Sequence, residues 1–582
     1  GNCEGHSRVI YSLSLLLILI LYLSLSFSHS PFIYLLLQST YSISSIPSMA
    51  RSFALTFTLL SLANALKILQ IVPGFTNSHV LFNYRLAETL TSLGHTVKLW
   101  TQMEMAMLDT GNNKLPKGVE EFRIPIQFKD KLKLDGLKVF QSMIFNSGDA
   151  YELWWTGQEF KSMRVEACEQ MLTLPDCVYS VWREEGFDLA IAHFHDLCPL
   201  AIADKMGVNN VVWITHGTSI YDFTAEALGL RTTPACLPHP LSSAGFELSF
   251  FDRLFNLLWH LSTIDFVNLP QDLLYEENFM YTELMGSSTP DLWSLSRKVP
   301  SLFINGERML DFPRPLPISI SFTGELGWKK NNRDETGLFA TLSRFVSASQ
   351  PASIFPEPLN SILENTKRGL IVFSLGTVSN TTNMPKIMID SFVGAFARID
   401  PGYTILWRME MEIEEAKGIS HLHLLKWLPQ RDLMRHPKMK LLIAHGGYNS
   451  LLETAQAGIP AVMMPLFADQ KINAQRATRF GIARILNKHT LSVEGVHETI
   501  NDVLTDEKYA KSARRLSLML SDRPTASNGG GANALFNYLL SLSTKDSRYF
   551  TLFPARHLSF IHFYSLPQFL FIPLVLLTIL SV

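Results

Sequence analysis

Four polar side chains follow the end of an apolar run at a spacing that suits the binding of phosphate. The run 441–444 stops at His445, a glycine pair follows, and a helical pattern then carries Asn449, Ser450 and Glu453. Glycines let backbone N–H groups come close to a phosphate, and the N-terminus of a helix favours negative charge. Glu453 lies one turn beyond Asn449 on the same helix face, where its carboxylate can accept hydrogen bonds. The stretch predicts a strand, a loop and a helix able to hold the diphosphate of a nucleotide.

Further polar residues flank this stretch on both sides. Trp427 and Gln430 precede it, and Asp469 and Gln470 follow a second apolar run after it. Taken singly, each residue type has an ordinary structural explanation: a tryptophan packs in a core, Asn and Ser cap helices, and a glutamate lies on a solvated helix face. Taken together at these spacings, they favour a site with a flat ring for a base and several hydrogen-bonding groups.

A second candidate for chemistry, His79, lies in the first strand-and-helix pattern of the chain. An apolar strand at 67–73 leads into a loop at 74–79, a helical pattern runs to Leu93, and a strand follows at 95–100. This order is the unit of a doubly wound parallel sheet, in which ligands collect at the carboxyl ends of the strands. A histidine there suits general base catalysis, because imidazole titrates near neutral pH. A structural histidine at a helix start is the alternative.

The remaining apolar runs fall into two series, which predict two α/β domains. Further strands are expected at 187–192, 210–215, 301–305, 318–323, 369–377, 403–407, 441–444 and 461–465. A polar, proline-containing stretch between the series predicts a linker at 326–366. We therefore expect an N-terminal domain at 66–325 and a C-terminal domain at 367–545.

The two ends of the chain are more apolar than the rest. Of the 582 residues 47% are hydrophobic, and the excess lies mostly at the ends. Residues 1–48 precede Met49, the first methionine, and are expected to be non-native upstream sequence. A true membrane anchor at 9–37 is the alternative. Residues 49–65 have the positive start, apolar core and small-residue end of a signal peptide. Residues 558–582 are expected to form a transmembrane segment.

Charge and cysteine content exclude some classes of protein and site. The formal net charge is -2, without a long basic block, so nucleic-acid binding is not expected. The five cysteines show no CxxC pair and no Cys/His ligand spacing, which argues against a zinc site. A disulfide among Cys168, Cys177, Cys198 and Cys236 would fit an oxidising compartment, and free buried thiols are the alternative.

The stretch 427–470 resembles the donor signature of UDP-glycosyltransferases in residue type and spacing. The matching residues are Trp427, Pro429, Gln430, His436, His445, Gly447, Asn449, Ser450, Glu453, Gly458, Pro460, Asp469 and Gln470. The wider likeness, over 66–545, is to the animal, UDP-glucuronosyltransferase-like branch of that family. It implies the GT-B fold, in which two doubly wound Rossmann-like domains face each other across a cleft, with a C-terminal membrane anchor. The N-terminal domain, 66–325, is expected to bind the acceptor, and the C-terminal domain, 367–545, is expected to bind the UDP-sugar.

The resemblance also assigns residues to the parts of the donor. By resemblance, Trp427 stacks on uracil beside Gln430, and Glu453 accepts hydrogen bonds from both ribose hydroxyls. Asp469 and Gln470 resemble the pair that hydrogen-bonds the transferred sugar.

Six residues are assigned to the diphosphate. They come from the loop after the second domain's first strand and from the glycine loop with its helix: Ser374, Thr377, His445, Gly447, Asn449 and Ser450. Because the helix dipole and these side chains would stabilise the leaving UDP, no metal ion or other cofactor is expected.

The resemblance makes His79 the catalytic base of a direct displacement that inverts the anomeric configuration. The family orients this histidine with an aspartate, as in a catalytic dyad. This sequence departs from the pattern, because the position after the 187–192 strand holds His193 and the nearest acid is Asp196. Asp196 is the expected partner after a small local rearrangement. The alternatives are no acidic partner, or another role for His193 and His195.

The implied function is that of a hexosyltransferase, a UDP-glucuronosyltransferase or UDP-glucosyltransferase. It would move glucuronic acid or glucose from the UDP-sugar to a hydroxyl of a small lipophilic acceptor, as detoxification enzymes do. The expected location is the endoplasmic reticulum membrane, as a single-pass type I protein with lumenal catalytic domains, and homo-oligomerisation is left open. Two alternatives remain: a sterol or sphingolipid glucosyltransferase, and a catalytically silent UDP-sugar-binding subunit.

Overall fold

The computed structural model describes residues 65–545 with gaps, together with Pro573 and Ile579. The longer gaps are 104–114, 129–143, 146–161, 264–272, 325–354 and 522–529. The predicted upstream sequence and nearly all of the predicted signal peptide and transmembrane segment lie outside the described residues, as does most of the predicted linker. Within the described part of the chain, no helix is both long and apolar enough to span a bilayer. The chain divides into the units Gly1–Ala65 and Leu66–Val582, and the second is described here.

Seven parallel strands form the first sheet. They are β1 (Lys67–Val72), β2 (Thr96–Met103), β3 (Glu120–Pro125), β4 (Leu189–His193), β5 (Val211–Thr215), β6 (Leu302–Ile304) and β7 (Ile320–Phe322). Their spatial order is β3-β2-β1-β4-β5-β6-β7. The order reverses between β1 and β4, as it does in a doubly wound sheet.

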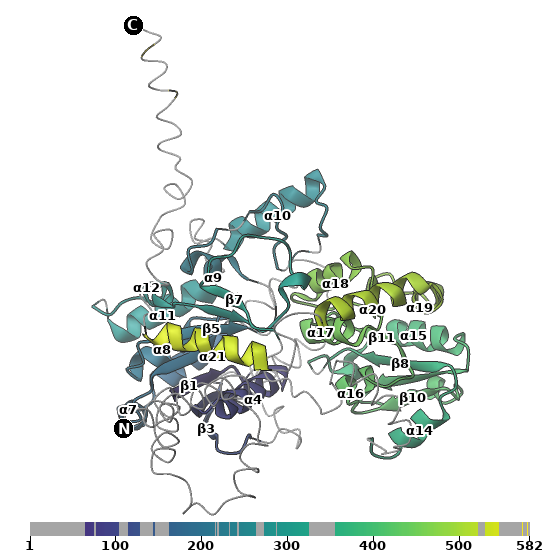
Figure 1. Ribbon diagram of the computed structural model, residues 1–582, viewed down its shortest axis with the longest axis horizontal. Coiled ribbons are helices and arrows are strands. Elements are labelled where there is room, and N and C mark those ends of the chain that lie inside the picture. The colour runs from purple at the N-terminus through teal and green to yellow at the C-terminus, as the bar shows by residue number, and fades with distance from the viewer. Residues whose placement is uncertain are drawn as a thin grey trace, which may run out of the picture. The chain divides into compact units, whose positions relative to one another are not determined.

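Helices cover both faces of this sheet (Figure 1). The helices of this part are α4 (Asn77–Ser92), α7 (Asp176–Glu184), α8 (Cys198–Lys205), α9 (Asp222–Ala227), α10 (Phe250–Thr263), α11 (Leu273–Met285), α12 (Leu292–Lys298) and α21 (Gly530–Lys545), of which α10 projects away from the sheet. On β1, Ile68 packs in a cluster with α4 and α21, whereas Leu69 packs in the cluster that holds α8 and α12. Successive strand residues point to opposite faces, so a strand buried on both sides is continuously apolar.

Helix α21 returns to the first sheet from the far end of the described chain. The rings of Phe303 and Phe536 lie 5.1 Å apart, and His95 Nε2 lies 2.9 Å from Asn537 Oδ1. The sequence places 530–545 in the C-terminal domain, but these side chains pack in the core of the other sheet.

Six parallel strands form the second sheet. They are β8 (Gly369–Ser374), β9 (Tyr403–Arg408), β10 (Leu422–Leu425), β11 (Met439–Ala444), β12 (Ala461–Met463) and β13 (Ala483–Ile485). Their order is β10-β9-β8-β11-β12-β13, with the reversal between β8 and β11. On β8, Ile371 and Phe373 pack in one cluster, and Leu370 and Val372 pack in another.

The second sheet also lies between helices. The helices of this part are α14 (Leu359–Asn365), α15 (Lys386–Ala397), α16 (Gln430–Met434), α17 (Tyr448–Ala457), α18 (Gln470–Arg479), α19 (Val493–Thr505) and α20 (Glu507–Ser521). Short 3₁₀ turns occur at Arg308–Leu310, Thr381–Asn383 and Glu414–Ala416.

Every strand that the sequence predicts is present, and three further strands are present that it does not predict. These are β3, β10 and β13, and each is an edge strand of its sheet. An edge strand buries fewer side chains, so it lacks the continuous apolar run that marks a central strand. In β3, four of the six side-chain positions are exposed, which explains why its sequence carries no such signal.

Candidate active site

Both sheets bring loops together where their strand order reverses. In the first sheet β1 and β4 are neighbours, so the segment with His79 follows a strand that lies beside the strand ending at His193. In the second sheet Ser374 of β8 pairs with Ala444 of β11, which brings the loop after β8 to His445. The crevice at such a reversal is the usual ligand site of a doubly wound sheet. Thr377, predicted to add a contact here, lies outside the described residues.

Two glycines make room for the ring of His445, and a third makes room for the backbone of Gln470. A Cβ atom on Gly376 would lie 2.7 Å from the imidazole ring, and one on Gly447 would lie 2.6 Å from its Nε2. A Cβ atom on Gly446 would lie 2.8 Å from the backbone oxygen of Gln470. Gly376 and Gly446 also have positive φ angles, which side chains other than glycine rarely adopt. Close packing at the two loops therefore requires glycine at these three positions.

His445 is a neutral imidazole in this structure. Burial, reinforced by the positive charge of Arg408, lowers the pKa of His445 to about 4. In a neutral imidazole one nitrogen donates and the other accepts. Among the described residues, the buried Nδ1 has no hydrogen-bond partner. The ring can therefore bond a ligand oxygen without bringing a positive charge of its own.

The same shift predicts how stability depends on pH. Because the pKa of His445 is lower in the folded than in the unfolded state, the stabilisation is full above about pH 6.5 and is lost as the pH falls through about 4. We expect the free energy of unfolding to drop by about 3 kcal/mol from this residue by pH 4. Denaturant titrations at several pH values from 7 to 4 give the free energy of unfolding at each pH. This free energy should fall less steeply with pH for His445→Asn than for the wild type. The same pH dependence of the unfolding free energy in both proteins would contradict the lowered pKa of His445.

Helix α17 starts directly after the glycine loop. Its N-cap residue is Gly447, and no side chain among the described residues caps it. Asn449 is exposed and Ser450 is buried, and both lie within the first turn. The alternative in which these two residues merely cap the helix is therefore wrong. The N–H groups of this turn, with the helix dipole behind them, suit an anion.

A hydrogen bond joins Gln430 to Glu453. The Gln430 Nε2 donates to Glu453 Oε2 over 2.7 Å. Burial raises the pKa of Glu453, and this effect is opposed by the Gln430 hydrogen bond and by the positive charges of Arg431, Arg85 and Arg435. Groups that donate hydrogen bonds to this carboxylate would favour its charged form. Glu453 is thus an acceptor that gains from pairing with hydroxyls.

Trp427 does not belong to the core. Its side chain is 50% exposed, whereas Trp100, Trp213 and Trp407 are fully buried. It lies between β10 and α16, the short helix that begins with Gln430. The core explanation for this tryptophan is wrong, and an exposed indole is a surface on which a base can stack.

We expect Trp427→Ala to weaken UDP binding roughly 5- to 100-fold, because stacking of a base contributes about 1–3 kcal/mol. Trp427→Phe should retain most of the affinity, since it keeps an aromatic face. Isothermal titration calorimetry with UDP measures both variants. An alanine variant that binds UDP as the wild type does would remove Trp427 from the site.

Asp469 and Gln470 lie at the start of α18, after a tight loop. The Gln470 Oε1 accepts hydrogen bonds from the N–H groups of Leu466 and Phe467 over 2.8 and 3.1 Å. Ala468 has a φ angle of 51°, a conformation that is costly for a residue other than glycine. Burial raises the pKa of Asp469. Gln470 therefore shapes the loop through its side-chain oxygen.

His79 lies among two other histidines. Its ring centroid is 5.8 Å from that of His193 and 5.5 Å from that of His195. The rings of His193 and His195 are stacked, with centroids 5.9 Å apart. His79 is partly buried and belongs to the first turn of α4. The structure thus brings His79 to the segment after β4, where the sequence predicts its partner.

A buried amide fixes the protonation of His193. Asn83 Nδ2 donates to the His79 carbonyl over 2.9 Å, and Asn83 Oδ1 accepts from Gln70 over 2.6 Å. Asn83 Nδ2 therefore also faces His193 Nε2, at 3.0 Å, as a donor. A donor requires an acceptor, so Nε2 carries no proton and His193 is neutral with its proton on Nδ1. His193 cannot supply the negative charge that the family's aspartate supplies.

Asp196 pairs with Arg164. The two side chains form a largely buried ion pair, and a disulfide joins Cys168 to Cys198 with 5.8 Å between their Cα atoms. Both links connect the helical segment 162–172 to the segment after β4. The disulfide alternative for the cysteines is thus the one observed for this pair, and Cys177 is free and exposed. Asp196 as the partner of His79 stays a prediction.

Removing the disulfide should lower stability. We expect Cys168→Ala/Cys198→Ala to lose roughly 2–4 kcal/mol of unfolding free energy, since a bridge across 30 residues constrains the unfolded chain. Thermal unfolding without reductant measures the change, and Cys177→Ala is the matched control. A double variant as stable as the control would show that the bridge contributes nothing.

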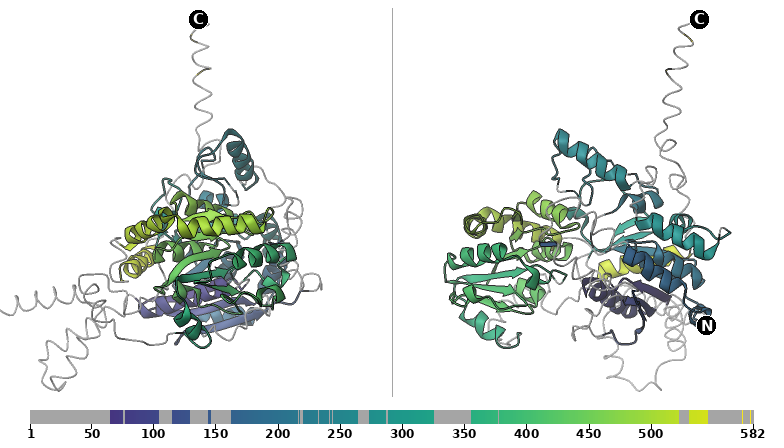
Figure 2. Two further views of the ribbon diagram at one scale, coloured as in Figure 1. Left: turned by 90° about the vertical axis from the view of Figure 1, so that its right-hand side faces the viewer. Right: turned by 180° about the vertical axis from the view of Figure 1, so that it is seen from behind.

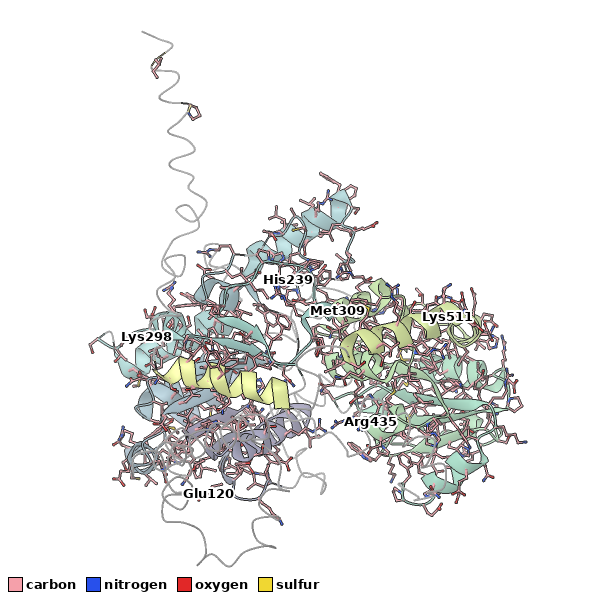
Figure 3. The ribbon with its side chains drawn as sticks, in the orientation of Figure 1. Glu120, His239, Lys298, Met309, Arg435 and Lys511 are labelled. Atoms are coloured by element: carbon pink, nitrogen blue, oxygen red, sulfur yellow. A yellow bond between two sulfur atoms is a disulfide. The ribbon has the colours of Figure 1, made fainter. Side chains whose placement is uncertain are left out.

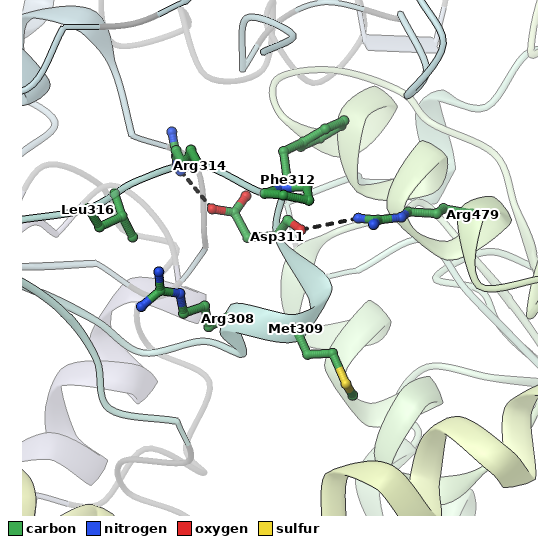
Figure 4. A pocket seen from close by; sticks show the side chains of 8 residues that line it. Arg308, Met309, Asp311, Phe312, Arg314, Leu316 and Arg479 are labelled. Atoms are coloured by element: carbon green, nitrogen blue, oxygen red, sulfur yellow. Dashed lines mark hydrogen bonds and ion pairs between the residues drawn. The ribbon is translucent and has the colours of Figure 1, made fainter. Parts of the chain in front are cut away.

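The sequence analysis assigns no role to the segment after β6, but this segment bonds to both helices of the proposed donor site, α17 and α18. The N–H of Glu307 donates to the hydroxyl of Tyr448 in α17 over 2.7 Å. The buried Arg476 of α18 pairs with Asp311 at 2.8 Å. This segment lines a pocket of about 280 Å³. Figure 4 shows Asp311 beside Arg314 in this pocket, where the two side chains form an ion pair. Tyr448 lies within the signature stretch 427–470, and this position is the feature of the sequence that could have indicated a role for it.

Comparisons with known proteins agree with this geometry. A family model described as UDP-glucoronosyl and UDP-glucosyl transferase matches residues 67–529. The Caenorhabditis elegans protein that carries the name UDP-glucuronosyltransferase ugt-60 is 60% identical over 511 residues, which are 88% of this chain and 96% of that protein. UDP-glycosyltransferase UGT5 of Dactylopius coccus is 26% identical over 481 residues, which are 81% of this chain and 83% of that protein.

Solved structures share the fold. The glycotransferase of kitacinnamycin matches with a TM-score of 0.52 at 15% identity, over 82% of this chain and 99% of the other. LpCGTa in complex with UDP matches with a TM-score of 0.50 at 14% identity, over 83% and 100%. These likenesses confirm the GT-B arrangement of two doubly wound parallel sheets. The chain belongs to the UDP-glucuronosyl and UDP-glucosyl transferase family, in its animal branch, and is a UDP-sugar-dependent glycosyltransferase.

Proposed function

We propose that this glycosyltransferase moves glucuronic acid or glucose onto a hydroxyl of a small lipophilic acceptor, with inversion at the anomeric carbon. The main support for this proposal comes from the residues packed around His445. This neutral ring lies between glycine loops at the start of a helix without a side-chain cap. The bonded pair Gln430 and Glu453 and the exposed Trp427 belong to the same signature.

On the donor side, each part of UDP meets a group suited to it. Uracil stacks on Trp427, and the ribose hydroxyls donate to Glu453, which stabilises its charged form. The diphosphate lies at the N-terminus of α17, where the dipole and the first N–H groups favour its charge. The side chains proposed to add contacts there are those of Ser374, Thr377, His445, Asn449 and Ser450, with the backbone of Gly447. Asp469 and Gln470 bond the sugar hydroxyls.

On the acceptor side, His79 acts as the general base. Its imidazole takes the proton of the acceptor hydroxyl while that oxygen attacks the anomeric carbon. The bond from this carbon to the diphosphate oxygen breaks, and UDP leaves with the electron pair. Attack on the face opposite to the leaving group inverts the configuration. Asp196 is proposed to position His79, and the kcat of Asp196→Asn, compared with the wild type, tests that role.

We also propose a lumenal location for the catalytic part, with the chain anchored in the endoplasmic reticulum membrane by residues 558–582. The disulfide Cys168–Cys198 supports this, because structural disulfides form in oxidising compartments. Protease protection in sealed microsomes tests it. Digestion of the catalytic part without detergent would place that part outside the lumen.

A product panel tests the proposed acceptor class. The purified protein is incubated with UDP-glucuronate or UDP-glucose and with phenols, sterols and ceramides, and products are identified by mass spectrometry. Glycosylated phenols are the expected result. Products from sterols or ceramides alone would favour the lipid glucosyltransferase. UDP-sugar binding without any product would favour the catalytically silent subunit. The reason to consider that alternative is that His193 stands where the family has an aspartate.

A further inference from the structure

Helix α10 carries its apolar side chains on the outside. Seven large apolar side chains of this helix are exposed: Phe250, Phe251, Leu254, Phe255, Leu257, Leu258 and Trp259. Figures 1 and 2 show α10 projecting from the β1–β7 sheet, with no described element on its outer side. Exposed apolar patches of this size on a folded protein mark an interaction surface.

The inner face of α10 is polar and fully bonded. Asn256 donates to the carbonyl oxygens of Pro234 and Leu237 over 2.7 and 2.8 Å, and accepts from the N–H of His239 over 2.7 Å. His260, one turn later, lies 2.9 Å from the carboxylate of Asp222. Asn256 and His260 are buried, and Figure 3 labels His239 at the base of the helix. Turning the helix would break these buried bonds, so its apolar face is held outward.

The exposed face has the composition of a membrane-interface helix. Asp252 and Arg253 are the only charged residues between Phe250 and Trp259, so the face offers few groups for the polar rim of a protein interface. Trp259 stacks on His239, with ring centroids 5.5 Å apart, yet remains 44% exposed. Aromatic rings of this kind are enriched at the boundary between headgroups and acyl chains. A helix of 14 residues is about 21 Å long and can lie flat on that boundary.

Helix α11, the next described helix along the chain, also exposes apolar side chains. Its side chains of Tyr275, Phe279 and Leu284 are 45%, 59% and 41% exposed. Tyr275 and Phe279 are four residues apart and so share a helix face. Two consecutive helices therefore present aromatic and aliphatic groups outward.

We propose that α10, with α11 beside it in sequence, inserts its exposed apolar face into the surface of a phospholipid bilayer. The proposal rests on the membrane anchoring proposed above, because the predicted segment 558–582 would bring the chain to a bilayer. Contact with the bilayer would place the acceptor-binding half where lipophilic acceptors dissolve. A second copy of the chain and its own segment 546–582 are the competing occupants of the face.

Photochemical crosslinking distinguishes these occupants. The full chain is made with p-benzoylphenylalanine at Phe255 and is reconstituted into phosphatidylcholine and phosphatidylethanolamine vesicles. The matched control carries the same group at Ile387, which is 73% exposed and lies between charged residues. Unchanged thermal unfolding and UDP binding show that both labelled chains are folded. We expect roughly tenfold more phospholipid adduct at position 255 than at position 387.

The other outcomes separate the two proposals. Vesicle flotation without a lipid adduct at 255 would overturn the role of α10 and leave the anchoring intact. Adducts that join two chains, or that join 255 to peptides from 546–582, would also overturn it. A chain that does not float with the vesicles would overturn the anchoring and, with it, the docking of α10.

Discussion

Replacing His79 by alanine is expected to lower kcat by roughly 10²–10⁴-fold, the range that general base catalysis contributes. The acceptor hydroxyl would then have to lose its proton to water. The affinity for UDP should not change, because His79 belongs to α4 of the first sheet and the proposed UDP contacts belong to the second. Initial rates at saturating UDP-sugar, together with the Kd for UDP, measure both quantities.

His489→Ala is the matched control for this variant, since His489 is an exposed histidine on the second-sheet side. It should retain the wild-type kcat. Transfer by His79→Ala at the rate of this control would show that His79 is not the base. Loss of UDP affinity in His79→Ala would show instead that the substitution disturbs the fold.

Replacing Glu453 by alanine is expected to weaken UDP binding by roughly 10²–10⁴-fold. Two hydrogen bonds from ribose hydroxyls to a carboxylate are lost, and hydrogen bonds to charged groups contribute about 1.5–3 kcal/mol each. The Gln430 amide would also lose the acceptor that it bonds at 2.7 Å. Calorimetry with UDP and with uridine measures the effect, which should appear for both ligands because both contain the ribose.

Glu453→Gln separates charge from shape. It keeps one acceptor oxygen, so we expect an affinity between those of the wild type and Glu453→Ala. Glu498→Ala on α19 serves as the control. If Glu453→Ala binds UDP as tightly as this control, the carboxylate does not hold the ribose.

The second half of the site could be predicted from the sequence because it is nearly continuous. The residues from Trp427 to Gln470 lie in one stretch of loops and helices around strands β11 and β12, so their spacing alone carries the pattern. The strands could be predicted where both faces are buried, as in β8, but three of the four edge strands could not, as in β3. The pattern could not predict how exposed a side chain is. Trp427 is half exposed and Trp407 is fully buried, yet the sequence does not distinguish them.

The first half of the site depends on contacts between residues far apart in the chain. The sequence places His79 after a strand, but the topology brings it to His193 and His195. The neutral state of His193 depends on the Asn83 amide, 110 residues away. The pairing of Asp196 with Arg164 likewise joins two segments that no local pattern connects. Such features arise from tertiary structure, and no spacing rule reports them.

The most direct test of the account is the structure of the product. Wild-type protein is incubated with UDP-glucose or UDP-glucuronate and a simple phenol, and the glycoside is examined by proton NMR as it forms. The expected product is a phenyl glycoside whose anomeric configuration is opposite to that of the donor, and His79→Ala should form it at least roughly 10²-fold more slowly. A product with retained configuration, or bound UDP-sugar that is never transferred to any acceptor, would contradict this account.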